Sequence, residues 1–154
     1  MSGRPTIAPH LNGAILVGAA TGLRSTIGLA ALINRRASGL PTWLAPEPAV
    51  VLAPLALTGE LVVDKLPSTP SRLGLTGLAG RVASAALAGA VIARSTDQSV
   101  SLAAFVACAA ALASARLGHD VRAAASGRLP PCAVAAAEDG LAFALGGAAA
   151  ASLP

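Results

Sequence analysis

The sequence predicts an all-α, polytopic membrane helix bundle of about five transmembrane helices. Of its 154 residues 55% are apolar, and the mean hydropathy is +0.70. Only 12% are charged, against roughly 25% in soluble domains, so a soluble fold would have little polar surface to offer water. Apolar runs long enough to cross the hydrocarbon, about 17 to 25 residues, recur along the chain. We therefore expect residues 1–154 to form a single transmembrane domain.

The first expected helix covers about residues 13–33. It is apolar apart from Arg24 and ends before Asn34. Because Arg24 interrupts the run and no clean cleavage context follows it, we expect a retained helix rather than a signal peptide. Gly18 and Gly22 form a GxxxG pattern, which favours close packing between membrane helices.

The second expected helix covers about residues 49–66 and follows a Pro-rich stretch. Trp43 in that stretch suits a membrane interface. The helix contains Pro54 and carries Glu60 and Asp64 in its second half. Because it is short and contains a proline, we expect this helix to be the one that is broken or re-entrant.

Three more helices are expected before the end of the chain. The third contains Arg81, the fourth is apolar as far as Ala115 and then meets Arg116, and the fifth carries Glu138 and Asp139. Prolines, glycines and polar residues separate them, which is typical of turns. Their expected ranges are about 73–93, 101–122 and 132–153.

The positive charges outside the expected helices predict an orientation. Five crossings would place Arg4, Lys65, Arg72, Arg122 and Arg128 on one side of the membrane, and Arg35, Arg36 and Arg94 on the other. The excess of positive charge favours a cytoplasmic N-terminus in the inner (plasma) membrane. The near balance of five against three leaves dual insertion open.

Two stretches share one order of features and suggest an inverted two-helix repeat. Each has an apolar run with an arginine, then a proline break, then an apolar run with an acid. The arginines are Arg24 and Arg116, and the acids are Glu60 and the Glu138–Asp139 pair. One helix would separate the two units and so invert the second, as in many transporters. The alternative is chance similarity in a chain rich in Ala and Gly.

Charged side chains inside the expected spans are the candidate functional residues. Each Arg or Asp at a helix centre costs about 2.5 to 3.5 kcal/mol to insert, so we expect them to pair between helices. One hypothesis is a transporter or channel-like protein for a small ion or solute, with a charged midplane site where acids exchange a cation or proton. The alternative is a structural or lipid-binding protein whose charges only lock the bundle. The residues of the candidate site are Arg24, Glu60, Asp64, Arg116, Glu138 and Asp139.

A second candidate site lies between the second and third expected helices. Thr69 followed by Pro70 is typical of a helix N-cap with proline in the first turn, and that structural role explains the pair. The functional alternative is an anion or lipid head-group site at the free amides of that helix start. It would consist of Lys65, Ser68, Thr69 and Arg72.

Other classes of protein are not favoured. The two cysteines and two histidines have no metal-ligand spacing, and neither a Ser–His–Asp order nor an HExxH motif occurs, so we expect no metal, no cofactor and no enzyme. The chain has no basic run and few aromatic residues, so no nucleic-acid partner is expected. The expected partners are the lipid bilayer, a small ion or solute, and further copies of the chain, since five helices leave little room for a pathway.

Three stretches resemble a known family. They are the long string from Gly59 to Leu73, Thr21-Gly22-Leu23-Arg24, and Glu138-Asp139-Gly140-Leu141-Ala142. Together they resemble a family of small bacterial membrane proteins known as domain of unknown function 4126, over nearly the whole chain. The resemblance implies an integral membrane protein and no particular activity.

Overall fold

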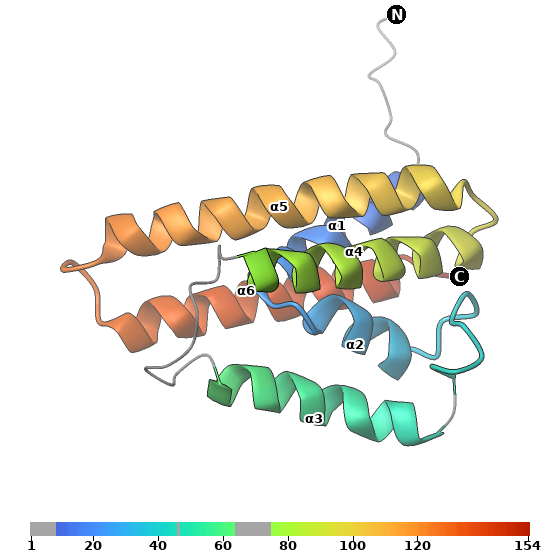
Figure 1. The fold of residues 1–154 in the computed structure, drawn as a ribbon, viewed down its shortest axis with the longest axis horizontal. Coiled ribbons are helices and arrows are strands. Elements are labelled where there is room, and N and C mark those ends of the chain that lie inside the picture. Colours follow the sequence, from blue (N-terminus) through green and yellow to red (C-terminus); the bar gives the residue numbers. More distant parts are fainter. Residues whose placement is uncertain (1–8, 46, 64–74) are drawn as a thin grey trace, which may run out of the picture.

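The computed structural model describes residues 9–45, 47–63 and 75–154, and this part of the chain is helical (Figure 1). It contains no strand over those residues, so the prediction of an all-α fold is confirmed for them. Six helices follow one another in the described part: α1 (Pro9–Leu23), α2 (Ile27–Asn34), α3 (Glu47–Val63), α4 (Leu75–Ser95), α5 (Val100–Ala125) and α6 (Pro131–Ala151).

Within the described residues, three helices are long and apolar enough to cross a membrane. They are α5, α6 and the Gly77–Ser95 part of α4, while Leu11–Leu23 and Glu47–Ala56 are shorter apolar segments. The outer faces of α5 and α6 carry large exposed apolar side chains such as Phe105 and Phe143. By length and composition these three helices are compatible with a membrane protein, and they are fewer than the five spans expected.

The first expected helix is divided in two, so a continuous helix over residues 13–33 is wrong. α1 ends at Leu23 and α2 begins at Ile27. Five of the eight residues 21–28 are Gly, Ser or Thr, which are weaker helix formers than Ala or Leu. The capping position Thr26 makes no side-chain capping bond, so composition rather than a strong cap accounts for the break.

α1 and α2 form a helical hairpin that enters and leaves the bundle at the same end. The second turn of α1 lies beside the last turn of α4, because a methyl group at Gly13 would lie 3.2 Å from Ile92 Cγ2. The chain leaving α2 returns to the same place, since the Gly39 amide donates to Ser95 Oγ at 2.9 Å. The first expected helix is thus a hairpin whose two arms lie side by side, and it does not cross the bundle as one helix.

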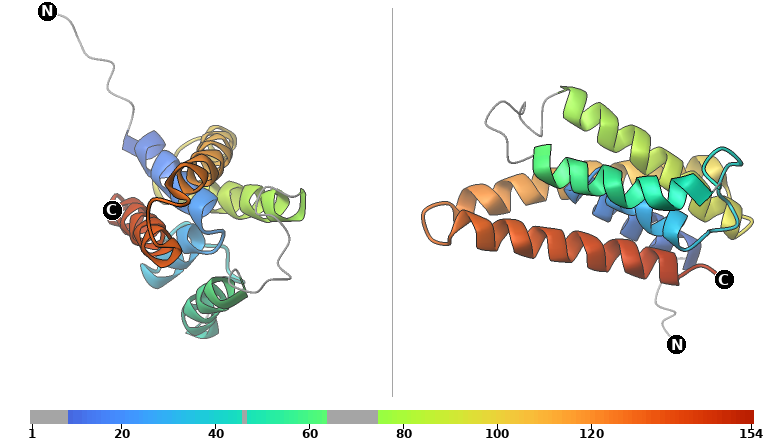
Figure 2. Two further views of the ribbon diagram at one scale, coloured as in Figure 1. Left: turned by 90° about the vertical axis from the view of Figure 1, so that its left-hand side faces the viewer. Right: turned by 90° about the horizontal axis from the view of Figure 1, so that it is seen from below.

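The second expected helix, by contrast, is unbroken. α3 continues through Pro54, and the Thr58 hydroxyl donates to the Pro54 carbonyl at 2.9 Å. Among the described helices α3 packs only against α2, and it lies at one edge of the bundle (Figure 2). The expectation of a break in this helix is therefore wrong, and whether it is re-entrant stays a prediction.

Small residues bring α1 close to α5, as the GxxxG pattern predicts. A Cβ at Gly18 would lie 2.2 Å from the Ala107 carbonyl oxygen, and one at Gly22 would lie 2.1 Å from that of Ala111. A side chain larger than hydrogen therefore cannot fit at either position without moving a helix. α1 also packs against α4 and α6, so the hairpin forms the centre of the bundle.

The hairpin changes the grouping of positive charges. Because α1 starts where α4 ends, the start of the described chain lies on the side of Arg35, Arg36 and Arg94. Five crossings had placed the N-terminus with Arg122 and Arg128 instead. The start of the described chain therefore does not lie on the side expected for it. Arg4, Lys65 and Arg72 lie outside the described residues, so the five-to-three division of charges stays a prediction.

Candidate functional site

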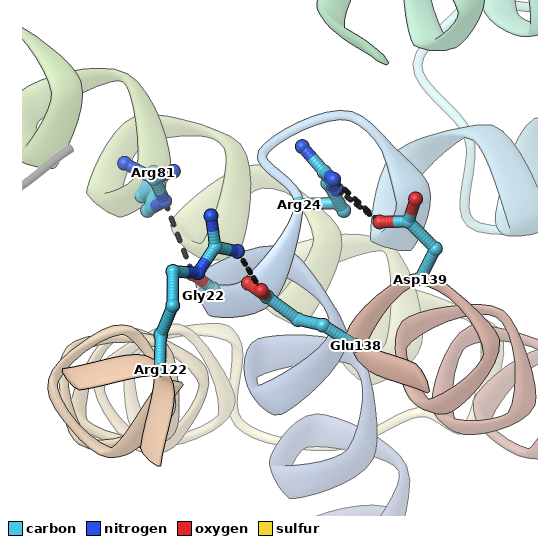
Figure 3. A network of polar contacts seen from close by, with 6 residues as sticks. All are labelled: Gly22, Arg24, Arg81, Arg122, Glu138 and Asp139. Carbon is cyan, nitrogen blue, oxygen red and sulfur yellow. Dashed lines mark hydrogen bonds and ion pairs between the residues drawn. The ribbon is translucent and has the colours of Figure 1, made fainter. Parts of the chain in front are cut away.

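The candidate site is a cluster of charged side chains around the break between α1 and α2 (Figure 3). Arg24 lies in the break itself, Arg81 comes from α4, Arg122 from α5, and Glu138 and Asp139 from α6. At 1.5 Å per residue, Arg81 lies roughly 9 Å along α4 and Asp139 roughly 12 Å along α6. The cluster thus lies about a third of the way along these helices, on the side of the α5–α6 loop.

The inner ion pair joins the break to α6. Arg24 Nε donates to Asp139 Oδ1 at 2.6 Å, and Arg24 Nη2 lies 2.5 Å from the same oxygen. The Arg24 side chain is 3% exposed and that of Asp139 is 26% exposed. Desolvating a guanidinium is costly unless a carboxylate accepts from it, so this pair makes the buried position of Arg24 tolerable.

The outer ion pair joins α5 to α6. Arg122 Nη2 donates to Glu138 Oε2, and the side chains are 41% and 11% exposed, respectively. Its arginine is far more exposed than that of the inner pair. The two acids are consecutive in sequence, yet one binds an arginine of the break and the other an arginine of α5, so this turn of α6 is held at two points.

Arg81 satisfies the backbone where α1 ends. Its side chain is 5% exposed, and its Nε donates to the Gly22 carbonyl at 3.0 Å. Its Nη1 also lies 3.3 Å from the Gly77 carbonyl of its own helix. The last carbonyls of a helix have no intrahelical donor, and inside an apolar bundle a side chain must supply one.

The structure brings together three of the six residues expected at the ion or solute site: Arg24, Glu138 and Asp139. Arg116 lies apart, because it is 67% exposed and its Nε donates to Asp120 Oδ2 at 3.1 Å, one turn along α5. The side chain of Glu60, and Asp64, lie outside the described residues. So do the four residues of the expected head-group site, Lys65, Ser68, Thr69 and Arg72.

Sequence reasoning missed the roles of Arg81 and Arg122. A signal existed for Arg122, because folding the chain about the turn at residues 127–130 brings it opposite Glu138. No comparable signal existed for Arg81, since its partner carbonyl belongs to a helix end that the sequence did not predict. Arg24 and Arg116 also have unlike surroundings, one at a buried break and one inside the exposed part of α5, so the described residues do not support the inverted repeat.

A cavity of about 420 Å³ lies between α5 and α6 beside the outer pair. Its lining is apolar apart from Glu138 and Ser114, and Leu23 at the end of α1 contributes to it. Glu138 is the one charged residue in this lining, so it is the acid of the cluster that faces the cavity, although its side chain is less exposed (11%) than that of Asp139 (26%). No group of three or more His, Cys, Asp or Glu residues within the described ranges could hold a metal ion.

Comparisons with protein-family models, with curated proteins and with solved structures found no match to this chain.

Proposed function

We propose that this chain is a multi-pass protein of the inner (plasma) membrane that moves a small ion or solute past the break between α1 and α2. In this proposal α3, α4, α5 and α6 cross the membrane, and the α1–α2 hairpin enters it from one side. The observation that carries the proposal is the buried Arg24–Asp139 pair at a helix break. Transporters use interrupted helices to bind substrates and coupling ions, and charges inside a membrane domain mark such pathways.

The two ion pairs have different roles in this proposal. The Arg24–Asp139 pair has a buried arginine and a partly exposed acid, and it holds the break against α6. Glu138 faces the cavity, and its partner Arg122 is partly exposed. Glu138 is therefore the group that takes up a proton or cation, and neutralising it weakens its bond to Arg122. That change is the step that couples the ion to movement of α5 relative to α6.

Ion flux into proteoliposomes under imposed pH and potassium gradients tests the proposal. Wild type is compared with Glu138→Gln and with the control Asp120→Asn, which removes an exposed acid from α5. We expect flux from wild type and from the control, and none from Glu138→Gln with an unchanged melting temperature. An equally folded Glu138→Gln variant with wild-type flux would exclude the assigned role.

The second candidate is a structural or lipid-binding membrane protein whose charges only lock the bundle. The observation in its favour is that each acid of the cluster already accepts from an arginine. Under this alternative wild type moves no ion, and Glu138→Gln lowers the melting temperature. The proposed homo-oligomer and the resemblance to domain of unknown function 4126 fit either candidate and stay predictions.

A further inference from the structure

Two adjoining cavities lie at the end of the bundle formed by α5, α6 and the loop between them. The apolar cavity, about 420 Å³, is lined by Leu117, Val121 and Leu141 among others. The second, about 460 Å³, surrounds the loop and is lined by Arg122, Ser126 and Arg128 among others. The two share the lining residues Ala125, Leu129 and Val134. One hollow thus has an apolar part and a cationic part.

The apolar part opens sideways, toward the lipid expected around the bundle. Leu117, Val121 and Leu141 are 63%, 61% and 53% exposed. α5 and α6 also touch each other less than any other contacting pair of the described helices, which leaves the groove between them unfilled. An acyl chain has the shape and polarity to occupy such a groove.

The cationic part lies where head groups would be. α5 has 26 residues and is therefore about 39 Å long, longer than the hydrocarbon thickness of about 30 Å. Its charged last turns and the loop after it extend into the head-group region. Arg128 in that loop is exposed, and no described carboxylate forms an ion pair with it. The acid nearest to the hollow, Glu138, is already bound by Arg122.

We propose that this hollow binds one anionic phospholipid of the surrounding membrane. Its phosphate lies between the Arg128 guanidinium and the Ser126 hydroxyl, and one acyl chain follows the groove between α5 and α6. A positive loop above an apolar groove matches a lipid with net negative charge, whereas a zwitterionic head group gains less from Arg128. The proposed phosphate contacts, Arg128 and Ser126, lie outside the charged cluster, although Arg122 lines the cationic part of the hollow and Glu138 lines the apolar part. Binding of the lipid does not require that the protein transports an ion.

Native mass spectrometry of the full chain in detergent tests the site, with phosphatidylglycerol and phosphatidylcholine as the two probes. We expect wild type to retain phosphatidylglycerol in preference to phosphatidylcholine. Arg128→Gln should weaken retention of phosphatidylglycerol about fivefold, the effect of one basic residue near an anionic surface. The matched control Arg94→Gln removes an exposed arginine from the last turn of α4, at the opposite end of the bundle from Arg128. It should leave the retention of both lipids unchanged.

A second pair of variants tests the acyl groove independently. Ala133→Phe fills the groove, because Ala133 lines it, and should reduce retention of both lipids. Ala144→Phe adds the same bulk on an exposed part of α6 that lines neither cavity, and should have no effect. Equal retention of the two lipids by wild type, or wild-type retention by Arg128→Gln, would overturn the proposal. So would equal behaviour of the two phenylalanine variants.

Discussion

The inner ion pair should be the strongest single polar contribution to the stability of the bundle. Asp139→Asn keeps the shape of the side chain and removes its charge. It leaves Arg24, which is 3% exposed, facing a neutral amide in place of the carboxylate oxygen that accepts from both Nε and Nη2. A guanidinium in an apolar environment cannot lose its charge, so the cost appears as lost stability.

The exposures of the two side chains set the magnitude. Breaking a buried pair costs about 3 to 5 kcal/mol. Because Asp139 is 26% exposed, water compensates part of the loss, and we expect about 3 kcal/mol, at the lower end of that range. For a chain of this length that corresponds to a melting temperature lower by about 6 to 12 °C.

Melting in detergent, followed by circular dichroism, measures the effect in a double-mutant cycle with Arg24→Gln. The cycle is needed because Arg24 makes a further interaction besides the one with Asp139, and only the coupling between the two sites reports the pair. The control is Glu47→Gln in the Arg36–Glu47 pair, whose side chains are 68% and 76% exposed and whose loss should be almost silent. If Asp139→Asn melts within 2 °C of wild type, roughly the effect of a surface pair, the view of this contact as a lock fails.

Two further predictions test the hairpin and its packing. Gly22→Ala should destabilise the protein strongly, because its Cβ would lie 2.1 Å from the Ala111 carbonyl oxygen. The control Gly140→Ala meets nothing within 4 Å and should stabilise α6 by about 1 kcal/mol. Similar melting temperatures of the two variants would refute the close approach of α1 and α5. In a Cys-free background in membrane vesicles, single cysteines at the exposed positions Asn12 and Ser38 should react with an impermeant maleimide from the same side, and one at Ser126 from the other. Labelling of Asn12 and Ser38 from opposite sides would mean that the first helix crosses after all.

The sequence predicts the helices well because composition alone excludes most other folds. A chain with 55% apolar and 12% charged residues has few ways to satisfy its backbone except as helices. The GxxxG pattern at Gly18 and Gly22 also indicated a close contact that the structure contains. The pattern of apolar residues does not show whether the chain continues across the bundle or turns back. A helical hairpin and a single crossing helix have the same apolar run.

The break itself could have been suspected from Thr21-Gly22 and Ser25-Thr26, residues with weak helix propensity on either side of a charge. Pro54 drew attention to the wrong helix. A proline in a helix removes one backbone bond, and α3 tolerates this at the edge of the bundle. The placement of Arg81 and Arg122 depends on tertiary contacts, which no local pattern in a single sequence encodes.

The position of Arg81 indicates why the hairpin and its charges belong together. A helix that ends inside an apolar bundle exposes carbonyls that neither lipid nor apolar side chains can satisfy. Arg81 donates to one of them, at Gly22, while Arg24 at the break needs Asp139 as its own counter-ion. The carbonyls at the break therefore need a donor such as Arg81. Arg24, which is buried in the break, needs a carboxylate on α6 as its counter-ion. Glu138 is not needed to satisfy either the carbonyls or the arginine of the break. Its partner Arg122 is 41% exposed and could be solvated without it. A carboxylate that the backbone does not need, facing a cavity of about 420 Å³, is the one residue of the cluster whose presence calls for a functional explanation.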